Sequence, residues 1–380
     1  MEGASSGSGD DGDHQRQVSD NETEIEEPEF DVRDISIHEA VLKDKVRNET
    51  YRAAILQHQD EYIKDKVVVD ARCGTGIFSI FCAQAGARRV YAVEATEIAV
   101  QAEKVMEANN LSERVIVLHG CMEDVEINEK VDVIVSDWMD QLLIYDYENL
   151  LGSILTARDR LLKPGGLIIP SRATLYIAPV TLPDRYSEKI DFWRNVYGID
   201  MSAMVPWAIQ DAYEDPCVET IKSENLLALP QVVKHVDCYT IRIQELESFT
   251  SRFNFQSLTR ATFHGFAFWF DVEFSGPVTS PADSNAPPSQ SSSNHPTGSG
   301  QKRKRDDSSE AIVLSTAPDK PPTHWEQMLV YLYHPIDVEQ GQQIEGSVTL
   351  TPNQEDGPNV HIRLVYKSGD RSFVREAVMR

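Results

Sequence analysis

The stretch KVVVDARCGTGIFSIFCAQAGARRVYAVEA, from Lys66 to Ala95, decides the fold of the first half of this chain. It begins with a β-branched run, turns at two glycines, continues as an apolar segment and ends in a second β-branched run. Strands are rich in β-branched residues, and glycine breaks mark the turns between elements. The order predicts a strand, a glycine turn, a helix and a second strand, which together form a β-α-β unit.

The segments on both sides of this unit extend the same alternation. We expect helices in EIAVQAEKVMEANN and in YENLLGSILTARDRLLKPGG, the second closed by its glycines, and strands in RVIVLHG and KVDVIVSD. From Ile37 to Ile55, apolar residues recur near the helical period, which predicts an entry helix or helix pair. The fold class expected for residues 31–169 is therefore α/β, a doubly wound, Rossmann-like parallel sheet.

The alternation stops after Pro170. Six segments are strand-like with turns between them: ATLYIAPV, KHVDCYTIRI, HGFAFWFDVEF, EQMLVYLYH, QIEGSVTLT and NVHIRLVY. We therefore predict an antiparallel β-barrel domain over residues 170–380. Within it, residues 184–213 form a predicted helical arm that is unusually aromatic, and exposed aromatic side chains favour burial in a homodimer.

Two segments lack the apolar residues that a core needs. Residues 1–30 hold ten acids and one basic residue, and residues 276–310 consist mainly of small and polar residues. We expect an acidic tail and an insertion that are both disordered. The insertion contains KRKR at Lys302–Arg305, which is typical of a nuclear import signal or, alternatively, of a solubilising charge run. We expect the protein in the nucleus and leave a cytoplasmic share open.

Composition excludes several classes of function. The formal net charge of -25 argues against direct nucleic-acid binding and favours a basic partner. The five cysteines show no CxxC spacing, which suits neither a disulfide framework nor a metal site. No run of 18 or more apolar residues occurs, so we expect no membrane span.

Three acids follow or end predicted parallel strands: Asp70, Glu94 and Asp137. In open parallel sheets, ligands bind beyond the carboxyl ends of the strands, so these acids should share one crevice. Gly74 and Gly76 allow the backbone to approach a ligand, and Glu94 suits two ribose hydroxyls. The third glycine of a dinucleotide turn is missing, which disfavours hydride chemistry. The sequence therefore predicts a nucleoside ligand.

Four motifs, VVVDARCGTGIFSIFCAQAGARRVYAVEAT, VDVIVSDWM, LLKPGGLIIPS and PPTHWEQ, resemble in order the motifs of type I protein arginine N-methyltransferases. The resemblance runs from about Ile35 to Arg380. It implies the cofactor S-adenosyl-L-methionine, bound by His38, Arg47, Asp70, Arg72, Gly74, Gly76, Glu94 and Glu123.

Within that set, the resemblance implies Glu94 on the ribose, Glu123 beside the adenine and Arg47 on the methionine carboxylate. Nine residues of one straight helix would put His38 and Arg47 on opposite faces, so both can serve only if the helix is broken between them. The alternatives are that Glu94 and Glu123 are ordinary strand-end surface acids and that Arg47 is a solvated helix residue paired with nearby acids.

The stretch VSDWMDQLLIYDYENLL carries Asp137 and Asp146, nine residues apart in a predicted hairpin. A guanidinium stays protonated at neutral pH, and two carboxylates can grip its N–H edges and orient it for methyl transfer. The resemblance places the family's two glutamates at these positions, with Met139, His324 and Trp325 around the substrate pocket. The alternative for Asp146 is an N-cap of a helix that begins near Tyr147.

The chain departs from the family pattern at several positions. Both glutamates are aspartates, Asp140 and Gln141 replace a glycine and a tyrosine, and Arg72 replaces the first glycine of the turn. The paired tyrosines before the first helix are also missing, with Phe30 as the only aromatic residue there. These departures predict reduced activity and weak cofactor binding.

The leading hypothesis is an arginine methyltransferase that makes monomethyl and asymmetric dimethyl arginine in basic proteins such as histone tails. The alternative is a catalytically impaired paralogue that serves as a binding or dimerisation partner. A small-molecule methyltransferase ranks last, because it explains neither the barrel nor the arm.

Overall fold

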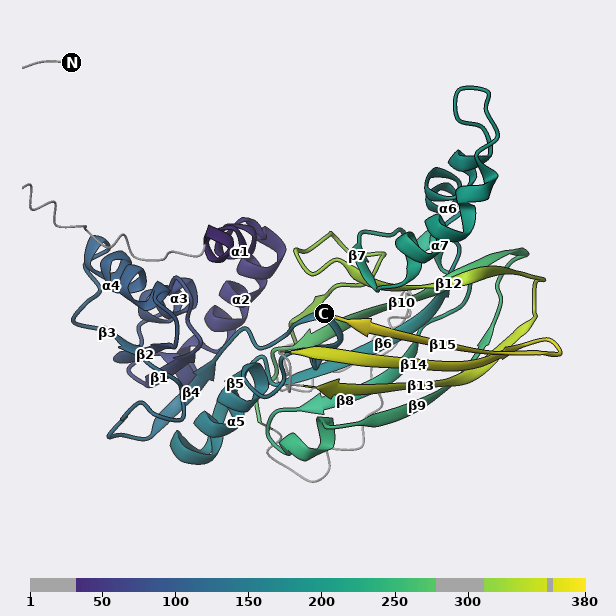
Figure 1. Cartoon of the computed structure of the whole chain (residues 1–380). Helices are drawn as coiled ribbons and strands as arrows, with labels where there is room; N and C mark the ends of the chain where they lie inside the picture. Colours follow the sequence, from purple (N-terminus) through teal and green to yellow (C-terminus); the bar gives the residue numbers. More distant parts are fainter. Residues whose placement is uncertain (1–31, 278–310, 354–357) are drawn as a thin grey trace, which may run out of the picture.

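The computed structural model describes residues 32–277, 311–353 and 358–380 (Figure 1). The predicted acidic tail, the basic cluster at 302–305 and nearly all of the predicted insertion at 276–310 lie outside the described residues. Within the described part of the chain, no helix is both long and apolar enough to span a membrane.

Five parallel strands form the first sheet, in the order β3-β2-β1-β4-β5. Their bounds are Val67–Ala71 for β1, Arg89–Glu94 for β2, Val115–His119 for β3, Val131–Val135 for β4 and Leu162–Ile169 for β5. The strand order reverses between β1 and β4, which leaves a ligand crevice at their carboxyl ends. The doubly wound sheet predicted from the sequence is confirmed.

Helices and short turns of helix accompany this sheet. They are α1 at Val32–Lys43, α2 at Lys45–Gln57, η1 at Gln59–Ile63, α3 at Ile77–Gln84, α4 at Ile98–Ala108, η2 at Gln141–Leu143 and α5 at Leu150–Leu161. The entry segment is a helix pair, one of the two forms expected. One helix prediction needs correction, because α5 ends at Leu161 and the glycines at 165 and 166 lie in β5. Pro164 disfavours helical backbone at Lys163, which ends the helix before the glycines.

Two antiparallel sheets make up the second half. The first has the order β7-β12-β10-β6-β8, with β11 paired to β10, at Cys217–Glu219, Gln327–Val338, Ala261–Glu273, Arg172–Val180, Gln231–Asp237 and Val313–Ser315. The second has the order β15-β14-β13-β9, at Arg371–Met379, Asn359–Ser368, Gln343–Asn353 and Phe249–Gln256. Phe266 of β10 and Phe253 of β9 pack 5.3 Å apart between ring centroids, so the two sheets share a core.

The sequence misjudged some strands of this half. The predicted strand KHVDCYTIRI ends at Asp237, where its carboxylate accepts from the Tyr239 amide at 2.9 Å and its carbonyl accepts from the Thr240 amide at 3.0 Å. The chain turns there and continues through η6 at Ile243–Leu246. Four strands were not predicted: β7, β9, β11 and β15. Strands β7 and β11 have only three residues each, and the apolar face of β9 and β15 is half-exposed, so the hydrophobic pattern of all four is weak.

The aromatic arm projects from the barrel, at the upper right of Figure 1. It consists of α6 at Pro183–Lys189, η3 at Asp191–Arg194, η4 at Ser202–Met204 and α7 at Val205–Tyr213, and η5 at Ser223–Asn225 follows it. Tyr197 is fully exposed and Trp207 is 71% exposed. The arm therefore presents large apolar side chains to water, as the sequence predicts.

Tyr51 of α2 joins the two halves beside the crevice. Its ring is fully buried, stacks on Phe78 of α3 at 4.0 Å and meets the edge of Phe274 at 4.9 Å. Its hydroxyl donates to the carbonyl of Ser136, just after β4, at 2.9 Å. Because Phe274 follows β10, α2 is packed between the parallel sheet and the barrel.

Candidate active site

A cavity of about 260 Å³ opens at the carboxyl ends of β1, β2 and β4 and under α1. Its lining comprises Ile37, His38, Val41, Arg47, Arg72, Cys73, Gly74, Thr75, Ile77, Glu94, Thr96, Asp137 and Leu150. The structure thus brings together five of the eight predicted cofactor residues and one of the two predicted catalytic acids. This is the topological switch point of the sheet, where ligands of such folds bind.

The turn after β1 needs glycine at two positions. Gly74 and Gly76 have φ of +54° and +84°, in the left-handed region that favours glycine. A Cβ at Gly74 would lie 3.4 Å from the His38 ring, and one at Gly76 would lie 2.2 Å from the end of Met106. Arg72 also has positive φ, at 63°, and its side chain is exposed at the rim of the cavity.

Asp70 lies beneath this turn and does not line the cavity. It is 1% exposed, and its Oδ2 accepts from the Ser79 hydroxyl at 2.7 Å. Burial raises the pKa of Asp70 to about 7, although the Ser79 hydrogen bond opposes the rise. Asp70 therefore anchors the start of α3 to the end of β1, and its part in cofactor binding is to support the turn.

Glu94 is held in position by three donors. The Gly74 amide donates to its Oε2 at 2.9 Å, and the amide and hydroxyl of Thr96 donate to its Oε1 at 3.0 and 2.9 Å. A carboxylate has about four acceptor sites, so about one remains for a ligand. The side chain is 8% exposed and lines the cavity, which disfavours the alternative of an ordinary surface acid.

Arg47 is buried and ion-paired with the first acid of the hairpin. Its Nε lies 2.6 Å from Asp137 Oδ2, and its guanidinium lies 4.4 Å above the Phe78 ring. The residue is 4% exposed, so the alternative of a solvated helix residue is wrong. The other oxygen of Asp137, Oδ1, is buried and meets no hydrogen-bond partner among the described residues.

Asp44 breaks the entry segment between α1 and α2. One of its oxygens accepts from the Arg47 amide at 2.9 Å, which caps α2. The other accepts from the His324 amide at 2.9 Å and lies 2.8 Å from the His324 ring. Burial raises the pKa of Asp44, but the hydrogen bonds from His324 and Arg47 outweigh it and lower the pKa. With this break, His38 and Arg47 both reach the cavity, and the sequence required such a break.

The wall of the predicted substrate pocket is also assembled. The Trp325 indole donates to the Met139 carbonyl at 3.3 Å, and the His324 and Trp325 rings lie 3.9 Å apart. Trp325 and Met139 are 4% and 5% exposed. The loop before β12 is therefore fastened to the acid hairpin.

Asp146, the second predicted catalytic acid, lies on the return side of the hairpin. Its Oδ1 accepts from the Asn149 side chain at 2.8 Å. Helix α5 begins at Leu150 with Asn149 at its N-cap position, so the alternative of Asp146 as the N-cap is wrong. The side chain is half-buried and does not line the cavity of about 260 Å³, so its role as the second clamp acid stays a prediction.

Asp140 is a third acid of this hairpin, which the sequence analysis noted only as a departure from the family pattern. Burial, together with the negative charges of Asp146 and Asp137, raises its pKa to about 6. The Gln141 amide, which donates to Asp140 Oδ1 at 2.7 Å, opposes the rise. The sequence signal that could have pointed to Asp140 was an acid in place of a glycine, within a hairpin already predicted to carry two acids.

Glu123 lies away from the cavity of about 260 Å³. It is exposed, accepts from the Thr156 hydroxyl at 3.0 Å and lines a separate hollow of about 700 Å³ between α5 and η6. Its place beside the adenine stays a prediction.

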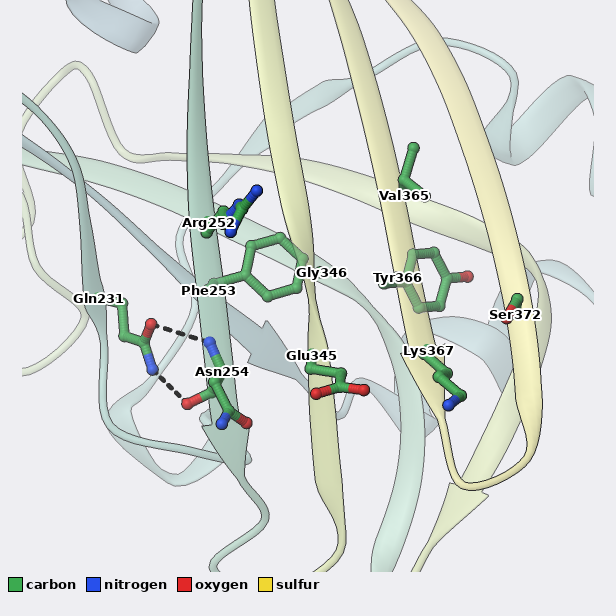
Figure 2. Close-up of a pocket in the computed structure, with 10 residues that line it drawn as sticks. All are labelled: Gln231, Arg252, Phe253, Asn254, Glu345, Gly346, Val365, Tyr366, Lys367 and Ser372. Carbon is green, nitrogen blue, oxygen red and sulfur yellow. Dashed lines mark hydrogen bonds between the residues drawn. The ribbon is translucent and has the colours of Figure 1, made fainter.

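A further hollow, of about 590 Å³, lies on the four-stranded sheet and contains none of the predicted site residues (Figure 2). At one edge of this hollow, the side-chain amide of Gln231 makes two hydrogen bonds with the backbone of Asn254, at 2.5 and 3.1 Å. Its charged lining residues are the basic Arg252 and Lys367 and the acidic Glu345. Volume alone therefore does not locate the chemistry, which depends on the acids at the sheet edge. Among the described residues, no cluster of His, Cys, Asp and Glu could hold a metal ion.

Two family models match the chain. Residues 171–295 and 304–371 match the arginine methyltransferase oligomerization subdomain, and residues 49–171 match ribosomal protein L11 methyltransferase. The probable protein arginine N-methyltransferase 6 of Arabidopsis thaliana is 62% identical over 349 residues, which is 91% of this chain and 80% of that protein. The protein arginine N-methyltransferase 6 of Danio rerio is 38% identical over 343 residues, 89% of this chain and 88% of that protein.

Two solved structures have the same fold over most of the chain. The PRMT1 enzyme-prozyme heterotetrameric complex with AdoHcy from Trypanosoma brucei has a TM-score of 0.74 at 28% identity, covering 90% of this chain and 98% of that one. Protein arginine methyltransferase 10 of Arabidopsis thaliana, in an open conformation, has a TM-score of 0.72 at 29% identity, covering 91% and 98%.

Proposed function

The chain belongs to the protein arginine N-methyltransferase family, S-adenosylmethionine-dependent enzymes, and we propose that it makes monomethyl and asymmetric dimethyl arginine in basic proteins such as histone tails. The observation that carries this proposal is the buried Oδ1 of Asp137 at the cavity, which has no hydrogen-bond partner in the part of the chain that the structure describes. A buried acceptor without a donor is costly, and a substrate guanidinium supplies N–H donors in the geometry that carboxylates accept.

The residues around the cavity fit S-adenosylmethionine. The backbone of Gly74 lines the cavity without a side chain, and Glu94 keeps about one acceptor site for a ribose hydroxyl. Arg47 supplies a cation for a carboxylate, and His38 covers the turn from α1. When bound, the cofactor supplies a methyl group made electrophilic by a positively charged sulfur.

On the substrate side, Asp137 and Asp146 accept hydrogen bonds from the guanidinium and orient its plane. His324, Trp325 and Met139 limit water access around it. The net charge of -25 attracts basic protein tails over the range of a Debye length, which supports histones as substrates.

The test is an assay of the full chain with labelled cofactor and a histone mixture, followed by mass spectrometry of the modified arginines. We expect label in arginine, as monomethyl and asymmetric dimethyl products. Asp146→Asn serves as the control, since it removes a charge from the clamp without breaking the ion pair between Arg47 and Asp137 and should lose turnover. Label found only as symmetric dimethyl arginine, or in no histone, would contradict the substrate and product assignments.

A second candidate is a catalytically impaired paralogue, and the ion pair between Arg47 and Asp137 favours it. In this pair, one oxygen of Asp137, the acid predicted to bind the substrate, contacts the guanidinium of Arg47, which is predicted to bind the cofactor carboxylate. Both groups are therefore already occupied. Calorimetry with S-adenosylmethionine discriminates the two functions. Micromolar binding with turnover supports the enzyme, whereas absent turnover together with firm binding to basic tails supports the paralogue.

We also propose a homodimer through the arm at residues 184–213 and a nuclear location. The match to an oligomerization subdomain supports assembly, and the cluster at Lys302–Arg305 supports nuclear import. Deletion of Lys302–Arg305 should shift a fluorescent fusion from nucleus to cytoplasm. Replacement of the same four residues by the charge-matched sequence of another nuclear signal should restore the nuclear distribution, and an unchanged distribution after deletion would refute the signal.

A further inference from the structure

The arm at residues 184–213 is joined to the barrel by a small core of its own, here called the arm root. Ile190 and Tyr213 of the arm pack there with Trp269 of β10 and with Leu329 and Tyr331 of β12. These buried residues form a hydrophobic cluster distinct from the main core, which extends through the parallel sheet and the interior of the barrel. The packing of the arm root is therefore separable from that of the main core.

A row of rings crosses the arm root. The His264 ring of β10 lies 5.6 Å from the Tyr186 ring of α6, measured between centroids. Tyr186 is stacked on Tyr213 of α7 at 6.2 Å, and Tyr213 is stacked on Tyr331 of β12 at 4.6 Å. The row thus joins both helices of the arm to two neighbouring strands of the barrel.

His264 holds the chain where it enters the arm. The amide of Leu182, directly before α6, donates to His264 Nδ1 at 3.0 Å. His264 lies between Phe263 and Gly265, where the pairing of β10 with β12 shifts register. Irregularities of this kind re-aim a side chain, and the ring of His264 contacts the arm. The first residues of the arm are therefore bonded to the barrel through a buried side chain.

Arg375 of β15 holds the chain where it leaves the arm. Its Nη2 donates to the carbonyls of Tyr213 and Glu214, at 2.5 and 2.7 Å, and its Nε donates to the Tyr331 carbonyl at 2.9 Å. The last carbonyls of a helix have no amide partner within the helix, and a cation is favourable at that end. Arg375 therefore caps α7 from the last strand of the barrel.

These two contacts hold the arm at both ends of its chain. His264 and Arg375 are each 4% exposed, so neither side chain offers a surface to a partner. The arm between them presents Tyr197 and Trp207 to water. Association costs less when an interface is already ordered in the free protein, so a fixed arm favours dimer formation.

We propose that His264 and Arg375 are positioning residues of the dimer: they fix the orientation of the arm and thereby set the affinity for a second copy of this chain. The inference rests on the proposed homodimer through the arm. Both residues act through α6 and α7 and not through contact with the partner. In a two-fold dimer both arms take part, so each loss of orientation counts twice.

The test measures the dimer dissociation constant of the full chain by sedimentation equilibrium for Arg375→Met and His264→Leu. Each variant removes one polar contact of the arm and leaves an apolar side chain in its place. A loss of about tenfold for each arm would raise the dissociation constant about 100-fold. Arg375→Lys keeps a cation and His264→Asn keeps an acceptor oxygen, so both should recover part of the affinity.

The matched control is Ile344→Ala. Ile344 is fully buried in β13 and belongs to the main core, so its truncation lowers Tm without altering the arm root. Its dissociation constant should equal that of the wild type. A second readout uses dilute, monomeric protein: hydrogen exchange over residues 183–213 should be faster in Arg375→Met and His264→Leu than in the wild type, and unchanged in β1.

The outcomes separate the inference from the dimer on which it rests. A dimeric wild type whose dissociation constant is unchanged in Arg375→Met and His264→Leu would overturn the inference and leave the dimer standing. An equal shift in Ile344→Ala would also overturn it, because lost stability alone would then explain the effect. A wild type that is monomeric at all concentrations would refute both. If Arg375→Met does not fold, His264→Leu and Arg375→Lys decide by the same criteria.

Discussion

At the scale of single residues, the ion pair between Arg47 and Asp137 joins the arginine predicted to bind the cofactor to the acid predicted to bind the substrate. The pair is nearly dry and its nitrogen–oxygen distance is 2.6 Å, so either charge alone would be buried without compensation. Breaking a buried pair by removing one partner typically costs about 3–5 kcal/mol. Substitutions that keep both charges are therefore the informative ones.

Lengthening the two clamp acids, which keeps both charges, is the first such test. Each aspartate is one methylene shorter than glutamate, and a misplacement of about 1 Å can cost on the order of 100-fold in rate. Replacing Asp137 and Asp146 together by glutamate should raise kcat on an arginine-rich peptide, with little change in cofactor affinity. Steady-state kinetics and calorimetry measure the two effects.

The alternative cause of the expected slow turnover is Arg72 at the cofactor turn, and Arg72→Gly separates the two. If the double glutamate variant stays slow while Arg72→Gly tightens cofactor binding, the turn limits activity. If both variants match a fully active parent, the hairpin already compensates for the shorter acids and the expectation of impairment is wrong.

Asp70 predicts a pH dependence of stability. Its pKa is raised by burial to about 7 in the folded chain, against about 3.9 unfolded. The folded state thus binds the extra proton between these values, and stability falls as pH rises from about 4 to 7, by at most about 1.4 kcal/mol per pH unit. Asp70→Asn should flatten this fall in thermal unfolding between pH 5 and 8, with Glu107→Gln as control. An equal slope in Asp70→Asn would assign the pH dependence to other groups.

At the scale of elements, Asp44 joins three parts of the site. It separates α1 from α2, caps α2 through the Arg47 amide and fastens the His324 loop. Because α1 turns at this residue, His38 covers the glycine turn while Arg47 points to Asp137. One side chain therefore aligns the cofactor side with the substrate wall.

Asp44→Ala should destabilise the chain and loosen the site. Loss of an N-cap costs about 1 kcal/mol, and the loss of the two contacts to His324 adds to it. We expect a lower Tm and weaker cofactor binding by calorimetry. Asp44→Asn keeps an acceptor oxygen for the cap and should retain most of the stability. Equal losses in both variants would mean that charge, and not the cap, determines the effect.

At the scale of the whole molecule, the arm carries three of the four exposed aromatic side chains among the described residues. Tyr197, Trp207 and Phe192 are 100%, 71% and 53% exposed, on an arm that projects from the barrel (Figure 1). An apolar surface of this kind is typical of a protein–protein interface. The match to an oligomerization subdomain agrees with this interpretation.

The wild-type chain should be a dimer by light scattering at micromolar concentration, and Tyr197→Ser with Trp207→Ser should shift it to monomer. The matched control is Leu229→Ser, which alters a residue 73% exposed outside the arm and should leave the dimer intact. A monomeric wild type, or a double variant that remains dimeric, would show that the arm is not the interface.

The sequence by itself determined most elements of the first half and six strands of the second, because β-branched runs, glycine turns and apolar periods are local signals. From that order came the sheet, its switch point and the crevice beside Gly74, Glu94 and Asp137. Local signals fail where a strand is short or the chain turns through its own hydrogen bonds. For this reason β7 and β11 were missed and the strand ending at Asp237 was extended too far.

Only the tertiary structure decided how distant residues meet. Arg47 pairs with Asp137 across 90 positions and Asp44 bonds to His324 across 280, and no local pattern encodes such contacts. The charge environment of Asp140 likewise arises only when the hairpin closes and the His324 loop packs beside it. Burial and pairing are properties of the packed chain. For this reason the sequence could name the acids, while the fold determined that Asp137 is ion-paired and that Asp44 caps a helix.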